Sequence, residues 1–122
     1  MYKIVFYEDK NGYAELEVAL LEYARKAPSN KNIRIQFKQI VYCVELLKEH
    51  GNCLPTTIAK HIEGDIWELR PGSNRILYFF FKNDNFVLLH MFRKTTQKTP
   101  KNEIDRAKKE CDDYIKRNGG EL

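Results

Sequence analysis

The sequence predicts one α+β domain that spans residues 1–122. Apolar residues recur at helical spacing towards both ends of the chain, whereas the middle holds short runs rich in β-branched and aromatic residues, separated by turn residues. Neither an internal repeat nor a low-complexity tract divides the chain. Its 43% hydrophobic and 31% charged residues suit a single core.

The first half of the chain predicts a strand followed by two helices. Residues 3–7 are β-branched and aromatic, and the turn-prone residues 9–12 end this strand. Residues 13–26 carry apolar side chains at helical spacing, and Pro28 prevents easy continuation of that helix. The short connection over residues 28–31 predicts an antiparallel helix pair. The second helix has Gly51 as a left-handed C-terminal cap and an apolar stripe of Ile33, Phe37, Ile40, Val41, Val44 and Leu47.

The second half predicts an antiparallel meander and a last helix. Strands are expected at residues 66–70, 75–81 and 86–92, with turns at 71–74 and 82–85 and an edge strand at 58–62. Trp67 and the run Tyr78–Phe81 should belong to the core, because alternate residues of a helix-covered sheet are buried. The last helix has Thr99 or Asn102 as N-cap, Gly119–Gly120 as its stop, and an apolar stripe of Ile104, Ala107, Cys111, Tyr114 and Ile115.

Several classes of protein do not fit this sequence. The longest apolar run, over residues 76–81, is far shorter than the roughly 20 residues of a membrane-spanning helix. The first residues lack the layout of a secretion signal, so we expect the protein to stay in the cytoplasm. Cys43, Cys53 and Cys111 form no C-x-x-C pair, which argues against a disulfide framework, a zinc site or a catalytic thiol. We expect no metal and no cofactor, and Cys43 and Cys111 should be core residues.

The charge distribution points to an anionic partner. The net charge of +4 is mild, but residues 93–102 contain four basic residues and no acidic one. This segment directly follows the last predicted strand. It can bind an anion such as nucleic acid, or it can be a solvated run of charges.

Strand pairing predicts where these charges gather. A hairpin with a four-residue loop places Arg70 opposite Arg75, and alternation puts Glu68 on the same face. Two facing cations need a carboxylate or an anionic ligand, so this pair either binds an anion or forms surface bridges to Glu68 and Asp65. Glu68 is thus either an ion-pair partner or a general base.

Continuing the register across the next turn adds more polar groups. Pairing Phe81 with Phe86 brings Leu77 near His90 and Arg75 near Phe92, and alternation puts Lys94 on the same side. Arginines, a lysine, a histidine and aromatic rings would then share one groove, which suits RNA because guanidinium groups bind phosphate and rings stack on unpaired bases. His90 is either a base or stacking platform there, or a buried histidine bonded to backbone. Such a groove also suits metal-free RNA cleavage, in which the 2′-hydroxyl is the nucleophile and cations stabilise the transition state.

Three segments in order resemble a known family. Residues 66–70 (IWELR), 75–79 (RILYF) and 88–100 (LLHMFRKTTQKTP) resemble the HigB-like, phage-derived branch of the RelE/ParE superfamily of toxins. The resemblance implies a RelE-like antiparallel sheet with two N-terminal helices and a C-terminal helix. It also implies ribosome-dependent cleavage of mRNA by metal-independent transesterification.

The resemblance assigns roles to individual residues. Arg75 would bind the scissile phosphate, Lys94 would be the second basic catalytic residue, and Arg70 and Lys98 would be flanking RNA contacts. Apart from the resemblance, we also expect Lys60, Phe92 and Arg93 to contact RNA, although alternation places Arg93 on the opposite side of the sheet unless the end of the strand splays it. Glu68 stands where many relatives have a lysine, and Pro100 lies about where some have a catalytic tyrosine. The candidate catalytic set is therefore Arg70, Arg75, Lys94, Glu68 and His90, with the general acid and base unassigned.

The resemblance further implies a partner, a HigA-like helix-turn-helix antitoxin that silences the toxin in a heterotetramer and links it to operator DNA. Two other functions fit the same fold, since fold does not fix function. One is a ParE-like poison of DNA gyrase, and the other is a non-catalytic module that binds nucleic acid or antitoxin in operon repression.

Overall fold

The computed structural model describes residues 1–119, and the predicted stop residue Gly120 lies outside them. The chain order is as follows: β1 (Lys3–Phe6), α1 (Glu15–Lys26), the short 3-10 helix η1 (Ala27–Ser29), α2 (Lys31–His50), β2 (Ala59–Glu63), β3 (Ile66–Leu69), β4 (Asn74–Phe81), β5 (Asn85–Arg93) and α3 (Lys101–Arg117). The expected α+β class and the order of elements are confirmed. Within residues 1–119, no helix is long and apolar enough to cross a membrane.

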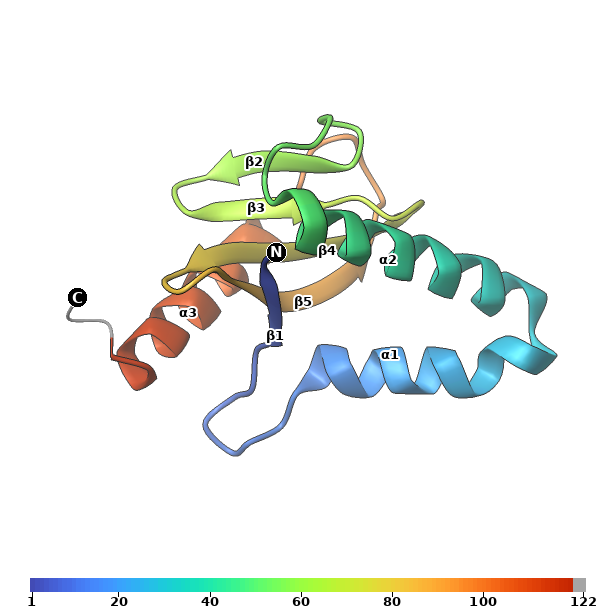
Figure 1. Cartoon of the computed structure of the whole chain (residues 1–122), viewed down its shortest axis with the longest axis horizontal. Coiled ribbons are helices and arrows are strands. Elements are labelled where there is room, and N and C mark those ends of the chain that lie inside the picture. The colour runs from blue at the N-terminus through green and yellow to red at the C-terminus, as the bar shows by residue number, and fades with distance from the viewer. Residues whose placement is uncertain (120–122) are drawn as a thin grey trace.

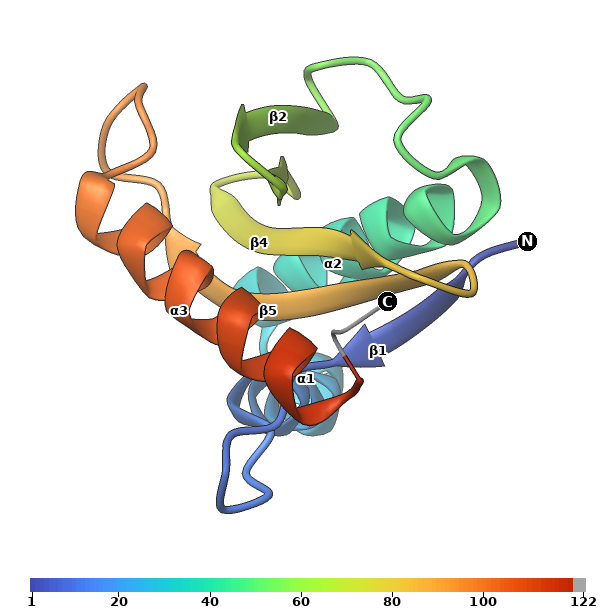
Figure 2. The same cartoon turned by 90° about the vertical axis from the view of Figure 1, so that its left-hand side faces the viewer.

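The five strands form one sheet in the order β1-β5-β4-β3-β2. The predicted meander from β2 to β5 is antiparallel, but β1 joins β5 in parallel, so the sheet is mixed. Helices α1 and α2 lie antiparallel on one face (Figure 1), and α3 crosses the other (Figure 2). Each face is therefore covered, which explains the nearly continuous apolar sequence of β4 and β5.

Each face of the sheet has its own core. On the side of α1 and α2, Leu16 and Leu47 pack with Tyr78 of β4. On the side of α3, Ala107 packs with Phe79. Cys43 and Cys111 are buried in these two cores, as their apolar stripes predict.

The boundaries of α2 follow from local chemistry. The Asn30 side chain accepts a hydrogen bond from the backbone N–H of Ile33 at 3.1 Å and so caps the first turn. Gly51 ends the helix with a positive φ of +63°, as predicted, but its ψ of −143° differs from that of the expected left-handed cap. A Cβ atom at Gly51 would lie 2.8 Å from the ring of Tyr2, so this position requires glycine for two reasons.

The predicted register between β4 and β5 is wrong at the turn and right at the other end. Phe81 pairs with Asn85 rather than Phe86, because the loop has three residues and both Asn83 and Asp84 take a positive φ. A β-bulge then adds one residue, Leu89, to β5. From there onward the pairs Leu77–His90 and Arg75–Phe92 form as predicted.

Three smaller expectations are also corrected. Neither Thr99 nor Asn102 caps α3, because the residue before the helix is Pro100, whose side chain has no acceptor. The first helix begins at Glu15 rather than at residue 13. Phe80 belongs to the run expected to be core, but it is 46% exposed because it lies near the end of β4. Its ring contacts only the rings of Tyr2 and Phe86 among the aromatic pairs of the described residues.

Candidate active site

A buried carboxylate, that of Glu68, organises the polar groups at one end of the sheet. Glu68 lies on β3, and its side chain is only 2% exposed. Its Oε1 accepts a hydrogen bond from Nε of Arg70 at 3.0 Å, and its Oε2 accepts one from Oγ1 of Thr99 at 2.6 Å. Nε of Arg75 lies 3.8 Å from the same Oε1. A carboxylate buried this deeply needs such partners, because an uncompensated buried charge is strongly unfavourable.

Arg75 is held in one orientation at the start of β4. Its Nη1 donates to the backbone carbonyls of Gly72 and Asn74, each at 2.8 Å. Burial lowers the pKa of Arg75, the nearby Glu68 raises that pKa, and Arg70 lowers it. The guanidinium stays a cation, since arginine does not deprotonate in proteins. Neither backbone bond uses Nη2, so this end of the fork can donate to an anion.

Arg70 and Arg75 lie at facing positions, one step beyond the pair Leu69–Ile76. The predicted pair of cations with Glu68 on the same face is therefore present. Glu68 lies between the two arginines, and its negative charge offsets the repulsion between the two cations.

The Thr95–Pro100 loop covers Glu68 and leaves two adjoining hollows. The first hollow is small and is lined by Glu68, Arg75, Phe92, Lys94 and the loop itself. The second has a volume of about 480 Å³, lies between β2 and the loop, and is lined by residues that include Lys60, Arg70 and Lys98. Gln97, Lys98 and Thr99 line both hollows, so the two hollows lie next to each other on either side of these side chains.

Lys94 is positioned by the backbone. Its N–H donates to the carbonyl of Ser73 at 2.8 Å, which extends the β4–β5 pairing by one residue past Asn74–Arg93. The exposed Lys94 side chain therefore lies beside Arg75. Five basic residues line the two hollows: Lys60, Arg70, Arg75, Lys94 and Lys98. Such a cluster can bind phosphate groups and stabilise negative charge that develops on them.

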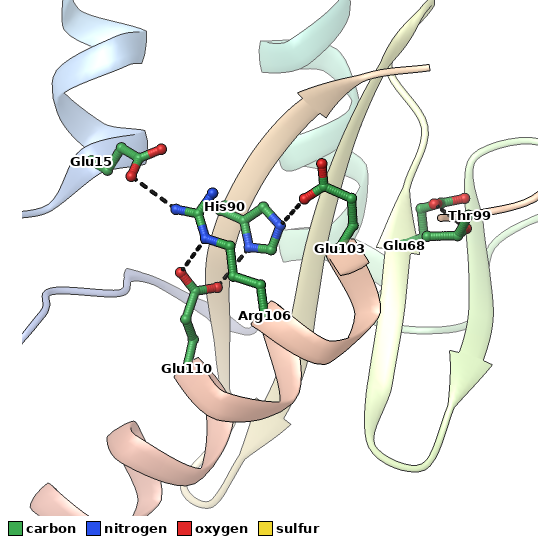
Figure 3. A network of polar contacts seen from close by, with 7 residues as sticks. All are labelled: Glu15, Glu68, His90, Thr99, Glu103, Arg106 and Glu110. Carbon is green, nitrogen blue, oxygen red and sulfur yellow. Dashed lines mark hydrogen bonds and ion pairs between the residues drawn. The ribbon is translucent and has the colours of Figure 1, made fainter. Parts of the chain in front are cut away.

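Two residues of the predicted site lie elsewhere. Nη1 of Arg93 donates to Oε1 of Gln36 at 2.7 Å, which places Arg93 against α2 on the opposite face. His90 is fully buried under α3. Its Nδ1 lies 2.6 Å from Oε1 of Glu110, and its Nε2 lies 2.9 Å from Oε1 of Glu103 (Figure 3). Its partners are carboxylates of α3 rather than backbone groups, and neither hollow includes His90.

A network extends from His90 to the first helix. Arg106 donates to Glu110 at 3.2 Å and to Glu15 of α1 at 2.8 Å (Figure 3). Glu110 thus contacts both a buried imidazole and a guanidinium. These bonds fix α3 on β5, and with it the end of the loop that closes the candidate site.

Sequence reasoning missed two residues of the site. The sequence predicts Thr99 only as a helix cap, yet its hydroxyl donates a hydrogen bond to Glu68; Gln97, to which the sequence assigns no role, lines both hollows. The polar composition of residues 95–99 between a strand and a helix was the available signal. Within residues 1–119, no group of three or more His, Cys, Asp or Glu side chains could hold a metal ion.

Comparison with known structures defines the fold class. The chain is similar to a protein in the crystal structure of the archaeal RelE–RelB complex from Pyrococcus horikoshii OT3, with a TM-score of 0.55 and 14% identity. The match covers 77% of this chain and 96% of that one. The fold is therefore RelE-like, with the arginine cluster at one end of its sheet.

Residues 26–112 match the phage-derived Gp49-like proteins (DUF891). This match spans most of the chain, so the protein belongs to that family, which is a family of RelE- and HigB-type toxins. No curated protein matches the chain.

Proposed function

We propose that this protein is the toxin of a type II toxin–antitoxin pair and that it cleaves mRNA during translation on the ribosome. The observation that carries the proposal is the cluster of Arg70, Arg75, Lys94 and Lys98 around the buried Glu68. RNA is the polyanion that also supplies its own nucleophile, the 2′-hydroxyl. RelE-like folds host this chemistry in the family that the sequence resembles.

The proposed reaction is a transesterification. The 2′-oxygen of one ribose attacks the adjacent phosphorus, the bond to the 5′-oxygen of the next nucleotide breaks, and a 2′,3′-cyclic phosphate and a 5′-hydroxyl result. One proton leaves the 2′-hydroxyl and one reaches the 5′-oxygen. The extra negative charge of the phosphorane-like transition state lies on the non-bridging oxygens, where cationic donors stabilise it.

The geometry supports a division of roles among the basic residues. Arg75, fixed by two backbone bonds, binds the scissile phosphate together with Arg70. Lys94, exposed beside Arg75, stabilises the developing charge. Lys60 and Lys98 hold flanking phosphates, and Phe92 offers a ring to a base.

Glu68 has a different role in this proposal. Of the two predicted proton acceptors, only Glu68 lines a hollow. Its carboxylate is already occupied by Thr99 and Arg70, so we assign it to orienting the arginines rather than to proton transfer. We assign no RNA contact to His90 or Arg93, because the first is buried under α3 and the second bonds to α2.

We further propose a protein partner. The similar archaeal chain was crystallised in a RelE–RelB complex, which supports an antitoxin for this chain as well. We propose a HigA-like helix-turn-helix protein that silences the toxin in a heterotetramer and carries it to operator DNA. The net charge of +4 favours an acidic segment on that partner.

The decisive experiment is primer extension on a reporter mRNA after induction in cells without the antitoxin. Wild-type protein is compared with Arg75→Ala and with the control Arg25→Ala, which removes an exposed arginine of α1 that pairs with Glu22. We expect cuts within translated codons for the wild type and the control. Loss of a preorganised charge-stabilising group costs about 10²–10³ in rate, so Arg75→Ala should leave almost no cuts.

Other outcomes separate the alternatives. Intact mRNA despite growth arrest would refute the ribonuclease, and inhibition of purified gyrase by the protein would then identify a gyrase poison. Harmless expression of the wild type would indicate a non-catalytic binding module. Cuts that persist in Arg75→Ala would refute the assignment of the scissile phosphate to Arg75.

A further inference from the structure

The larger of the two hollows has features that phosphate binding alone does not require. It has a volume of about 480 Å³, within the range of roughly 300–1,000 Å³ that small-molecule sites occupy. One wall comes from β2 and the end of β3, and the other comes from the Thr95–Pro100 loop and the first turn of α3. Figure 2 shows this loop standing opposite β2, with α3 following it.

Its lining combines three kinds of chemistry. Lys60, Arg70 and Lys98 are cationic, Ile62 and Ile104 are apolar, and the exposed Gln97 carries an amide with both a donor and an acceptor. Glu63 also borders the hollow, but its carboxylate is paired with Lys108 of α3. The hollow therefore remains positively charged at its rim, with an apolar surface beneath.

Arg70 connects this hollow to the site of the proposed reaction. It lines the larger hollow while its Nε bonds Glu68, which lines the smaller one next to Arg75. A chain whose phosphate lies on Arg75 would thus place its next residue in the larger hollow.

We propose that the larger hollow is a subsite for one unpaired nucleotide next to the scissile phosphate. Its phosphate meets Lys60 and Lys98, its base lies against Ile62 and Ile104, and the amide of Gln97 bonds the edge of the base. Unpaired bases expose edges that an amide can read, so this subsite contributes sequence preference. The inference rests on the proposed ribonuclease function for its biological meaning, but binding can be measured without cleavage.

The binding test uses a fully 2′-O-methylated trinucleotide, which has no free 2′-hydroxyl and cannot be cleaved. It is titrated into the protein while NMR follows the methyl signals of Ile62, Ile104 and the remote Ile35, an exposed residue of α2. We expect the first two signals to shift and the third to stay. Unshifted Ile62 and Ile104 signals with bound RNA would overturn the subsite.

Variants separate this subsite from general attraction between charges. Lys60→Ala should lower the slope of log affinity against log salt by about 1, as expected for one lost phosphate contact. The matched control Lys38→Ala, on the exposed face of α2, should leave that slope unchanged. Equal losses in the two variants would overturn the inference.

Cleavage mapping then distinguishes this proposal from the proposed function. Gln97→Ala should broaden the distribution of bases beside the cuts. An unchanged distribution in Gln97→Ala, with active cleavage, would overturn the subsite and leave the ribonuclease standing. Trinucleotide binding at Ile62 and Ile104 by a protein that cuts no mRNA would support the subsite and refute the ribonuclease.

Discussion

His90 should be among the most costly residues to replace in this protein, although it lies outside both hollows. It is fully buried, and both ring nitrogens are bonded to carboxylates of α3. His90→Ala removes both ring nitrogens that contact these carboxylates and leaves Glu103 and Glu110 facing an empty space, with side chains only 22% and 12% exposed. Leaving a buried polar group without its hydrogen-bond partner costs about 1–3 kcal/mol, and here two carboxylates each lose a partner. Domains of this size have roughly 5–15 kcal/mol of stability in total.

The partners should matter less than His90 itself. Glu103→Gln keeps an oxygen that can accept a bond from the ring, and Glu103 is the more exposed of the two carboxylates. We expect it to cost about 1 kcal/mol, the typical net value of one hydrogen bond. Glu110→Gln should cost more, because Glu110 also bonds Arg106, which in turn holds Glu15 of α1.

Urea unfolding of the purified variants, followed by circular dichroism, measures these differences. The control is His50→Ala at the exposed end of α2, which should change the free energy of unfolding by less than about 0.5 kcal/mol. Hydrogen exchange should show α3 opening more readily in His90→Ala than in the control. A cost of His90→Ala no greater than that of the control would refute the reasoning, since the contacts would then contribute nothing to stability.

Two further predictions concern the backbone and the pH dependence of stability. Gly51→Ala should lower the free energy of unfolding more than Gly64→Ala does. Both glycines have a positive φ, and an alanine in that conformation costs about 1–2 kcal/mol. Only the new Cβ at position 51 would also meet the ring of Tyr2. Equal losses of stability in urea unfolding would contradict the predicted clash with Tyr2. The pH prediction concerns Tyr7: burial and the hydrogen bond to Asp113 raise the pKa of Tyr7 from 10.0 to about 12. The unfolded chain therefore loses the Tyr7 proton first as the pH rises, and this stabilisation is intact below about pH 10 and lost as the pH approaches 12. Tyr7→Phe should thus destabilise by about 1 kcal/mol near neutral pH, and the gap to the wild type should close between pH 10 and 12; a constant gap would be the contrary result.

The helices, strands and core were predictable because their signals are local and periodic. The stripe that includes Ile40 and Leu47 runs over about four turns of α2, and the alternation in β4 assigns Tyr78 and Phe79 to opposite faces. The same alternation was enough to place Glu68 with Arg70 and Arg75, since facing strands share a face once the hairpin is known.

Contacts between distant segments were not predictable in this way. The carboxylates that bond His90 come from α3, and nothing in the sequence of β5 indicates how that helix is rotated on the sheet. The bond from Thr99 to Glu68 likewise depends on the path of a loop with no periodic pattern. Both contacts became visible only in three dimensions, and together they decide which predicted residues line the site.

The register between β4 and β5 shows how a correct site can follow from an incorrect turn. The observed loop has three residues instead of the four assigned from the sequence. Without a bulge, this shorter loop would shift every later pair by one position and move Phe92 to the face of α2. The bulge at Leu89 adds one residue to β5 and cancels this shift, so Arg75 still faces Phe92 and Leu77 still faces His90. A bulge also increases local twist, and it lies between the turn and the site. It therefore keeps Phe86 and Leu88 in the core beneath α1 and α2 while Phe92 and Lys94 are directed to the opposite face, where the basic groups gather.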